Sequence, residues 1–322
     1  MNRRTVAPVS PEEHPRERRP VISRTSWSSV RLALGVAILA VLLWRVGAEP
    51  FVDGVRTAGA GNVTAALAIT ALTTICCAWR WRVVAAGLGL DLPLRPSVAA
   101  YYRSQFLNST LPGGVLGDVH RAVRHGRDVG DLGLGLRSVV WERCLGQAVQ
   151  VALTVAVLLA LPSPMRPTAL VVAAVGVATG LVLLVVRRVP RDLRRILSTG
   201  RARLSIALTS AVAAAGHTAI FLIALESTGV NVSTTRMLPV VLLVLLAAAV
   251  PTNVAGWGPR EGAAAWAFGT VGLTAGQGVT AAVLYGVLAL AATLPGAVLL
   301  LVARHGRATP VPPAAHVDVV HG

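Results

Sequence analysis

The sequence contains no lysine, so all 30 of its basic residues are arginine, against 14 acidic residues. Charged residues make up only 14% of the 322 residues, compared with about 25% in a soluble domain. This scarcity excludes an ordinary water-soluble protein. Hydrophobic residues account for 54% of the chain and the mean hydropathy is +0.66. The composition is therefore that of an integral membrane protein with one membrane domain.

Cysteine and recognised catalytic motifs are also scarce. Cys76, Cys77 and Cys144 all fall in apolar segments, where a free cysteine usually packs as a small hydrophobic residue. Their spacing fits neither a disulfide framework nor a metal site. The seven histidines form no H-E-x-x-H pattern, and no G-x4-G-K-[ST] nucleotide-binding motif occurs. We therefore expect no metal, no cofactor and no ATPase activity.

The net charge of +16 could suit nucleic-acid binding, but the arginines lie between apolar segments, which favours a role in membrane orientation. Suppose that residues 97–131 form a hairpin that enters from the cytoplasm and returns there. The inner segments then carry 23 arginines and the outer segments carry four. A full crossing by residues 97–116 would instead place eleven arginines in two outward loops. The positive-inside rule thus predicts the hairpin, with both termini on the cytoplasmic side of the plasma membrane.

The apolar segments predict an all-α, polytopic transmembrane helix bundle over residues 27–305, between disordered tails at 1–26 and 306–322. Six full spans are expected, at 27–46, 62–78, 134–161, 168–186, 204–227 and 279–302. Two shorter pairs are interrupted, 97–108 with 117–127 and 238–250 with 262–272. The first pair is expected to be re-entrant, and the second either re-entrant or two tilted crossings. Residues 49–61 are expected to form an outer connection, residues 79–82 an inner boundary, and residues 187–203 a basic amphipathic loop.

Both interruptions, LPGGVLGDVHR at 111–121 and VPTNVAGWGPRE at 250–261, combine helix-breaking residues with charge. Lipid cannot satisfy the backbone groups that a broken helix frees, so such breaks lie in protein or beside a wet cavity and often form polar binding sites. The helix-breaking residues are Pro112, Gly113, Gly114 and Gly117, and then Pro251, Gly256 and Gly258. The pattern P-x2-V-x-G-x3-R occurs in both, which indicates either an inverted repeat or a coincidence among abundant Gly and Val.

Ionisable residues within a bilayer are costly, at about 2.5–3.5 kcal/mol each on insertion scales, and so tend to be paired and functional. The candidate substrate-binding residues are Arg103, Asp118, Arg121, Glu142, Arg143, Gln147, Arg260 and Glu261. Adjacent helical residues do not face each other, so Glu142 and Arg143 should find partners on other segments. Arg143, Gln147, Gln150 and Thr154 recur on one helix face, which should line the interior.

From this pattern we expect Arg121, Arg143 and Arg260 to face one shared cavity and to bind an anionic head group, because a guanidinium can bond two phosphate oxygens. The acidic residues would orient these arginines or contact a cationic or hydroxylated head group. Structural interpretations stay open. Glu142 and Arg143 can be members of structural ion pairs. Arg260 and Glu261 can be an interfacial pair at the start of a helix. His217 can be an interior residue that forms a hydrogen bond.

Three stretches together resemble the lysylphosphatidylglycerol synthase transmembrane, or flippase-like, family. They are YYRSQFLNSTLPGGVLGDVHRAVRHGRDVG, VVWERCLGQ and PTNVAGWGPREGAAAWAF. The family's Pro-Gly-Gly-Asp-x-x-Arg, Glu-Arg and Gly-x-Gly-x-Arg-Glu-Gly segments fall on 112–121, 142–143 and 256–262. The chain departs from them in the inserted Val115 and Leu116 and in Trp257-Gly258-Pro259. The resemblance covers most of residues 27–305.

The resemblance implies movement of an aminoacylated phospholipid, or another lipid-linked substrate, between leaflets. Bifunctional members add a soluble aminoacyl-transferase domain, which this sequence lacks after its last span, so no such enzyme activity is expected. Two other hypotheses are a membrane scaffold for a separate lipid synthase or glycosyltransferase, and a lipid-modifying enzyme using Glu142, or Asp118 with His120, as acid and base. The expected partners are membrane phospholipids, with homo-oligomers left open and nucleic acid not expected.

Overall fold

The computed structural model describes residues 44, 49–111, 113–168, 170–172, 175–176, 189–250 and 257–305. Within these ranges the chain folds into helices without a β-strand, and the expected helical membrane bundle is confirmed. The helices are α2 (Glu49–Arg56), α3 (Ala60–Gly87), α4 (Leu94–Thr110), α5 (Leu116–Asp128), α6 (Leu132–Ala160), α8 (Val189–Ile196), α9 (Gly200–Ser227), α10 (Thr234–Ala248), α11 (Pro259–Thr270) and α12 (Ala275–His305). The expected span at 27–46 apart from Trp44, most of the span at 168–186, both tails, Pro112, Pro251 and Gly256 lie outside the described residues.

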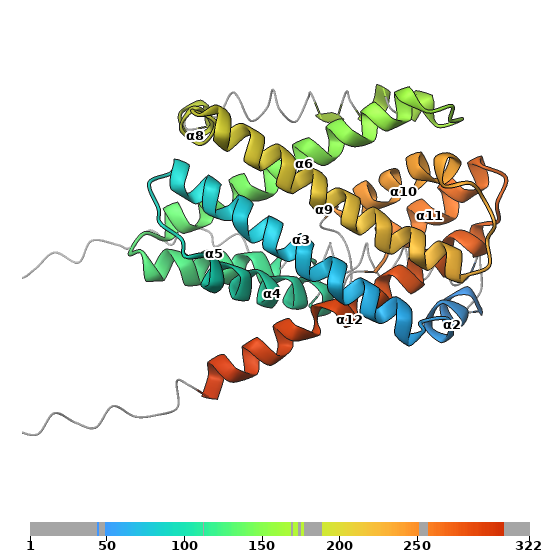
Figure 1. Ribbon diagram of the computed structural model, residues 1–322, viewed down its shortest axis with the longest axis horizontal. Coiled ribbons are helices and arrows are strands. Elements are labelled where there is room, and N and C mark those ends of the chain that lie inside the picture. Colours follow the sequence, from blue (N-terminus) through green and yellow to red (C-terminus); the bar gives the residue numbers. More distant parts are fainter. Residues whose placement is uncertain are drawn as a thin grey trace, which may run out of the picture.

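Four described helices, α3, α6, α9 and α12, are long and apolar enough to cross a membrane. A helix of 28 residues, such as α3 or α9, is about 42 Å long at 1.5 Å per residue, more than the roughly 30 Å hydrocarbon core. In Figure 1, α3 and α9 run alongside each other, and α6 and α12 slope the other way across them. They correspond to four of the six expected spans.

Helices α4 and α5 form a hairpin that returns to the end of the bundle from which it starts. Gly117, at the beginning of α5, packs against the carbonyl oxygen of Ser104, late in α4, so closely that a Cβ there would collide with it. The later part of α5 lies beside the beginning of α4, because Ser97 and His125 line the same pocket. The two helices are therefore antiparallel, as expected for a re-entrant pair.

Helices α10 and α11 form a second hairpin at the opposite end. Gly272, just after α11, lies beside Arg236 in the first turn of α10, 4.0 Å from the position that a Cβ would occupy. In Figure 1 this pair lies in the half of the molecule near α2, and the α4–α5 pair lies in the half near α8. The second pair is thus an antiparallel hairpin as well, and its two expected courses, re-entrant or two tilted crossings, stay predictions.

Three local expectations are changed by the structure. Residues 49–61 contain a helix, α2, rather than only a connection. Helix α3 does not end near Ala78 but continues to Gly87, so Arg80 and Trp81 are buried inside the bundle instead of marking its boundary. This continuation is possible because no proline interrupts α3 and because the charge of Arg80 is neutralised by Glu142. The basic loop contains the short helix α8.

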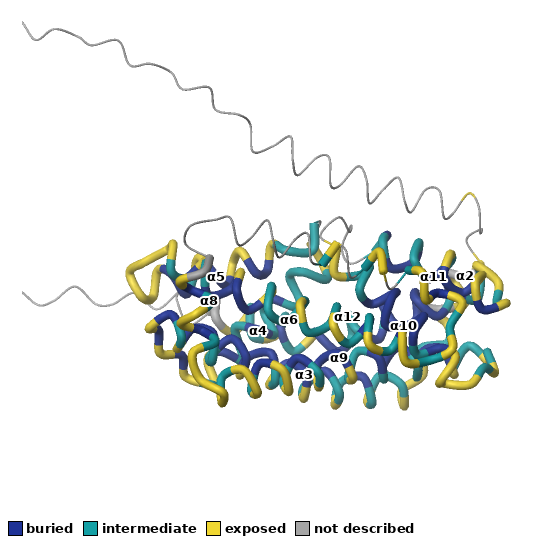
Figure 2. The backbone as a smooth tube through the Cα atoms, turned by 90° about the horizontal axis from the view of Figure 1, so that it is seen from above, coloured by how far each residue is buried: buried dark blue, intermediate teal, exposed yellow. Residues whose placement is uncertain are grey.

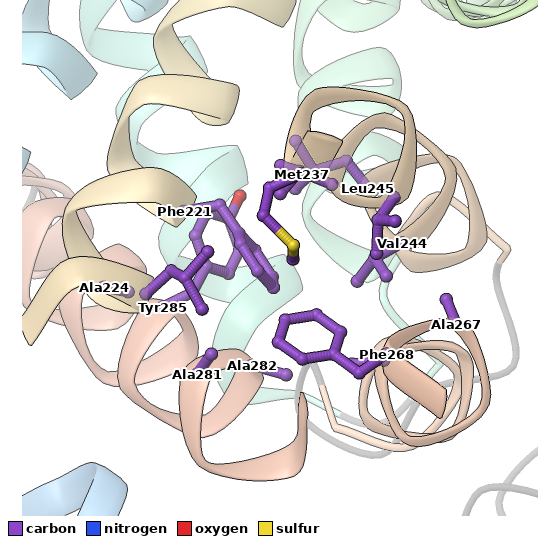
Figure 3. Packing of buried hydrophobic residues seen from close by; sticks show 14 of the residues in the cluster. Phe221, Ala224, Met237, Val244, Leu245, Ala267, Phe268, Ala281, Ala282 and Tyr285 are labelled. Atoms are coloured by element: carbon purple, nitrogen blue, oxygen red, sulfur yellow. The ribbon is translucent and has the colours of Figure 1, made fainter. Parts of the chain in front are cut away.

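The largest apolar core joins α9, α10, α11 and α12 (Figure 3). Phe221, Met237, Phe268 and Tyr285 meet there, surrounded by small residues such as Ala281. Helices α11 and α12 approach closely, because a Cβ on Gly278 would lie 2.5 Å from the carbonyl oxygen of α11 residue Ala264. Small residues at such crossings are typical of membrane helices, where packing replaces the hydrophobic effect. Buried residues run along the middle of the bundle and exposed residues along its rims (Figure 2).

Candidate functional site

Glu142 on α6 is the centre of a buried charge network. Its side chain is fully buried. Its Oε1 accepts hydrogen bonds from Arg80 on α3 (Nε, 3.1 Å, and Nη2) and from the hydroxyl of Tyr101 on α4 (3.1 Å). Its Oε2 accepts one from Nη2 of Arg121 on α5 (2.9 Å). One carboxylate therefore joins four helices.

Asp118, in the first turn of α5, is the second acidic member of this network. Its Oδ1 accepts hydrogen bonds from Ser104 and Arg121, each at 2.9 Å, and its Oδ2 accepts one from Asn108 at 3.0 Å. Oδ2 also forms an ion pair with Arg143 of α6. Glu142 and Arg143 thus find their partners on other segments, as expected for adjacent helical residues.

The network contains three arginines (Arg80, Arg121 and Arg143) and two carboxylates, which leaves a formal charge of +1. The Arg80 and Arg121 side chains are at most 7% exposed, whereas the side chain of Arg143 is 45% exposed. Arg143 therefore has the most exposed side chain of the three arginines. A buried site with excess positive charge favours an anion.

A second charged pair lies at the start of α11. Arg260 donates to Glu261 through Nε (3.0 Å) and Nη2, and Oε2 of Glu261 accepts from the backbone N–H of Gly258 (2.7 Å). Gly258 has a φ of 120°, a backbone conformation that residues other than glycine rarely adopt. Arg260 also lies over the ring of Tyr285 on α12, 5.1 Å from its centroid, and the Tyr285 hydroxyl lies 3.1 Å from Nδ1 of His217.

A polar cavity of about 300 Å³ connects the two charged groups. Arg80, Arg143 and Arg260 all line it, together with amide, hydroxyl and histidine side chains from α3, α4, α6, α9 and α12. The polar members other than arginine include Gln105, Asn108, Ser109, Gln147, Gln150, Ser210, His217, Tyr285 and Thr293. We refer to this space as the central cavity.

The tips of the two hairpins meet at the central cavity. Asn108 and Gly114, from the tip of α4–α5, line it, and so do Ala248 and Arg260, from the tip of α10–α11. The N-terminal ends of α5 and α11 thus lie in the interior of the bundle, where the positive ends of their helix dipoles favour negative charge. Hairpins that enter from opposite ends and meet at a polar site are the arrangement known from transporters with inverted repeats.

The structure separates the residues that were expected to share one cavity. Arg143, Gln147 and Arg260 line the central cavity. Asp118, Glu142 and Glu261 are buried next to it as partners of the arginines. Arg121 and Arg103 do not line it but line a second, smaller pocket. Thr154 is buried and donates to Gln150 within α6, so the polar face of α6 reaches the cavity only as far as Gln150. The substrate-binding role of all these residues stays a prediction.

Sequence reasoning missed Arg80, Tyr101 and Tyr285. Arg80 lies in Trp79-Arg80-Trp81-Arg82, which has the composition of a membrane boundary. Within this segment, buried and boundary residues differ only in the helix face on which they fall, since Trp79 is exposed and Trp81 is buried. The two tyrosines carried a weaker signal, because isolated aromatic residues in apolar helices usually pack in the core.

Comparison with known proteins identifies the family. No curated protein matches the chain. A family model described as the lysylphosphatidylglycerol synthase TM region matches residues 29–296. The three sequence motifs that resemble this family contribute the α4–α5 tip, the Glu142–Arg143 pair and the start of α11, which are the elements around the central cavity. The chain therefore belongs to the lysylphosphatidylglycerol synthase transmembrane-region family.

Proposed function

We propose that this protein is a lipid flippase or transporter that holds the head group of an aminoacylated phospholipid or lipid-linked precursor in the central cavity. The observation that carries the proposal is the convergence of Arg80, Arg143 and Arg260 on one buried polar space inside a membrane bundle. Placing charged residues within a membrane costs free energy, and arginines there can form charge-assisted hydrogen bonds with the phosphate group of a substrate.

The chemistry of the lining fits a head group that carries both charge signs. The excess positive charge suits the phosphate, while Gln105, Gln147 and Gln150 offer both donors and acceptors for an aminoacyl group. The volume of about 300 Å³ lies at the lower end of the range for small-molecule sites, so the acyl chains of a lipid must lie elsewhere.

An apolar groove of about 960 Å³ offers a place for those chains. It lies between α3, α4 and α12, the same helices that contribute to the central cavity. Neighbouring residues of α12 serve the two spaces, since Thr293 lines the cavity and Leu294 lines the groove. A polar space and an apolar space that share three helices fit an amphiphilic substrate.

The test is translocation of fluorescently labelled phosphatidylglycerol, and of its lysylated form, in vesicles that contain the purified protein. We expect head-group translocation that slows by about tenfold or more in Arg143→Gln and Arg260→Gln, because each change removes charge-assisted hydrogen bonds. Arg127→Gln is the matched control, because Arg127 is exposed on α5 and lines none of the described pockets. Translocation that survives both cavity substitutions would defeat the site assignment.

The same assay separates the other two functions. A scaffold would give no translocation until a partner synthase or glycosyltransferase is added. An enzyme would convert the added lipid into a new product. The geometry favours neither form of acid–base catalysis, because Glu142 and Asp118 are each held by two arginines and His120 is exposed on the surface of α5.

A further inference from the structure

A second polar pocket of about 140 Å³ lies between the hairpin helices α4 and α5 and the end of α3. Five basic or imidazole side chains line it, Arg103, His120, Arg121, Arg124 and His125, and one acidic side chain, Asp128. None of these residues lines the central cavity. We call this space the hairpin pocket.

Arg121 enters the hairpin pocket with donors that nothing in the described chain accepts. Its Nη2 is used by Asp118 and Glu142, but Nε and Nη1 are buried without a hydrogen-bond partner among the described residues. The faces of the guanidinium are covered by the rings of Trp81 and Tyr101, at 4.6 and 4.3 Å from the centroids. The unsatisfied N–H groups therefore lie at its edge. A buried donor left without an acceptor costs about 1–3 kcal/mol, so such groups call for a ligand.

His125 repeats this pattern one helical turn later. Its Nε2 is also buried without a partner among the described residues, and its ring packs edge-on against Trp81 with centroids 5.4 Å apart. Arg121 and His125 stand four residues apart on α5 and so share one face. Two unpartnered buried groups from the same helix face thus border one small space.

The walls of the pocket supply few acceptors for the unpartnered N–H groups of Arg121. Asp128 is exposed, and the hydroxyl of Ser97 already donates to the carbonyl oxygen of Pro93 at 2.8 Å. Arg124, half-buried on the same face of α5, adds a further positive charge. The volume suits a small oxyanion, so only the phosphate group of a larger ligand would lie inside the pocket.

We infer that the hairpin pocket is a second anion site, separate from the central cavity, which binds a phosphate group. The site lies at the end of the bundle that carries α8 and the turn after α3, where a Cβ on Gly87 would lie 2.6 Å from Cα of Ile196. Arginine counting places this end in the cytoplasm. The phosphate group is that of a soluble ion or monoester, or that of an inner-leaflet phospholipid.

The first experiment measures binding of inorganic phosphate to the purified full-length protein by calorimetry, against chloride at equal ionic strength. Wild type is expected to bind phosphate, and Arg124→Gln to bind it about tenfold more weakly, because the variant lacks one positive charge of the pocket. The variant should still fold, since Arg124 is only half-buried and its replacement leaves no unpaired charge. Arg127→Gln, on the same helix but outside the pocket, should bind as wild type does. Arg143→Gln, in the central cavity, should keep the part of the phosphate binding that depends on Arg124. Loss in Arg143→Gln with retention in Arg124→Gln would place the anion in the central cavity and overturn the inference.

The second experiment distinguishes the sources of the phosphate group. Glycerol 3-phosphate and the short-chain lipid dihexanoyl phosphatidylglycerol are titrated into the same four proteins. Arg124-dependent binding of the first identifies a soluble ligand, and Arg124-dependent binding of the second identifies a lipid. If neither compound nor inorganic phosphate binds in an Arg124-dependent manner, there is no second anion site. Because the readout is binding, the result does not depend on whether the protein transports lipid.

Discussion

The guanidinium of Arg80 lies directly against Gly146 of the neighbouring helix α6, where a Cβ would come within 2.8 Å of Cζ. Arg260 has the same relationship to Gly286 of α12, where a Cβ would collide with its guanidinium. Two of the three arginines at the central cavity thus occupy space that a glycine leaves open. These glycines belong to the site although they carry no functional group.

Replacement of Gly146 by alanine should therefore disturb the cavity without removing a charge. The added methyl group pushes Arg80 away from Glu142, and we expect a loss of about 1–3 kcal/mol of stability, as for other overpacked positions, with slower translocation. Thermal unfolding in detergent and the vesicle assay measure the two effects. Gly269→Ala is the control, since its Cβ would meet nothing within 4 Å. Equal behaviour of the two variants would contradict the assignment.

Replacement of Glu142 by glutamine should destabilise the bundle strongly. It leaves Arg80 buried without its acidic partner and weakens the hold on Arg121, and breaking one side of a buried pair costs about 3–5 kcal/mol. Unfolding in detergent, followed by tryptophan fluorescence, measures the change. A combined Arg80→Met and Glu142→Gln variant should recover part of the loss, because it removes a buried charge. A single variant as stable as wild type would show that the pair carries little energy.

Two substitutions at Tyr285 separate its hydroxyl from its ring. Tyr285→Phe removes the hydrogen bond to His217 and keeps the ring beneath Arg260, so we expect a stability loss of about 1 kcal/mol and little change in head-group binding. Tyr285→Leu removes both and should weaken binding further, because cation–π contacts in desolvated sites reach about 2 kcal/mol. Titration with labelled lipid distinguishes them. Identical affinities would mean that the ring does not support Arg260.

Asp192 should hold α8 on the bundle. Its carboxylate accepts hydrogen bonds from Arg137 and from the indole N–H of Trp141, each at 3.2 Å, so that α8 is attached to α6. Asp192→Asn weakens the charged contact and should increase hydrogen exchange and protease cleavage within α8, while the rest of the bundle is protected as before. Unchanged exchange in α8 would show that the apolar contacts of Ile196 suffice.

Membrane topology can be tested with single cysteines at exposed positions. In a chain whose three native cysteines are replaced by alanine, Arg127→Cys should react with an impermeant maleimide only after cells are opened. Asn231→Cys, in the turn before α10, should react in intact cells. The reverse pattern would invert the orientation that the arginine count predicts and place the hairpin pocket outside the cell.

The sequence predicted the class of fold and the position of the hairpins well, for a simple physical reason. Proline, glycine and charge within an apolar chain can be tolerated only in protein-lined places, so Asp118 and Glu142 had to lie inside. The burial of Arg80 could not be predicted in this way, because its local sequence also suits a membrane boundary. It depends on the direction in which Glu142, 62 residues later, projects its carboxylate.

The division into two pockets could not be read from the sequence either. Arg121 and Arg143 both bind Asp118, and their motifs give no reason to separate them. The separation comes from the rings of Trp81 and Tyr101, which cover the faces of the Arg121 guanidinium. Aromatic residues on α3 and α4 thus determine that Arg121 lines the hairpin pocket and not the central cavity.

The two hairpins differ in how their charges are satisfied. The acidic groups that hold the tip of α4–α5 are shared with α3 and α6, whereas Arg260 and Glu261 pair with each other inside α11. Displacement of α4–α5 would therefore break ion pairs between helices, while α10–α11 can shift with its own pair intact. For the transport proposed above, we therefore expect α10–α11 to move while α4–α5 stays in place.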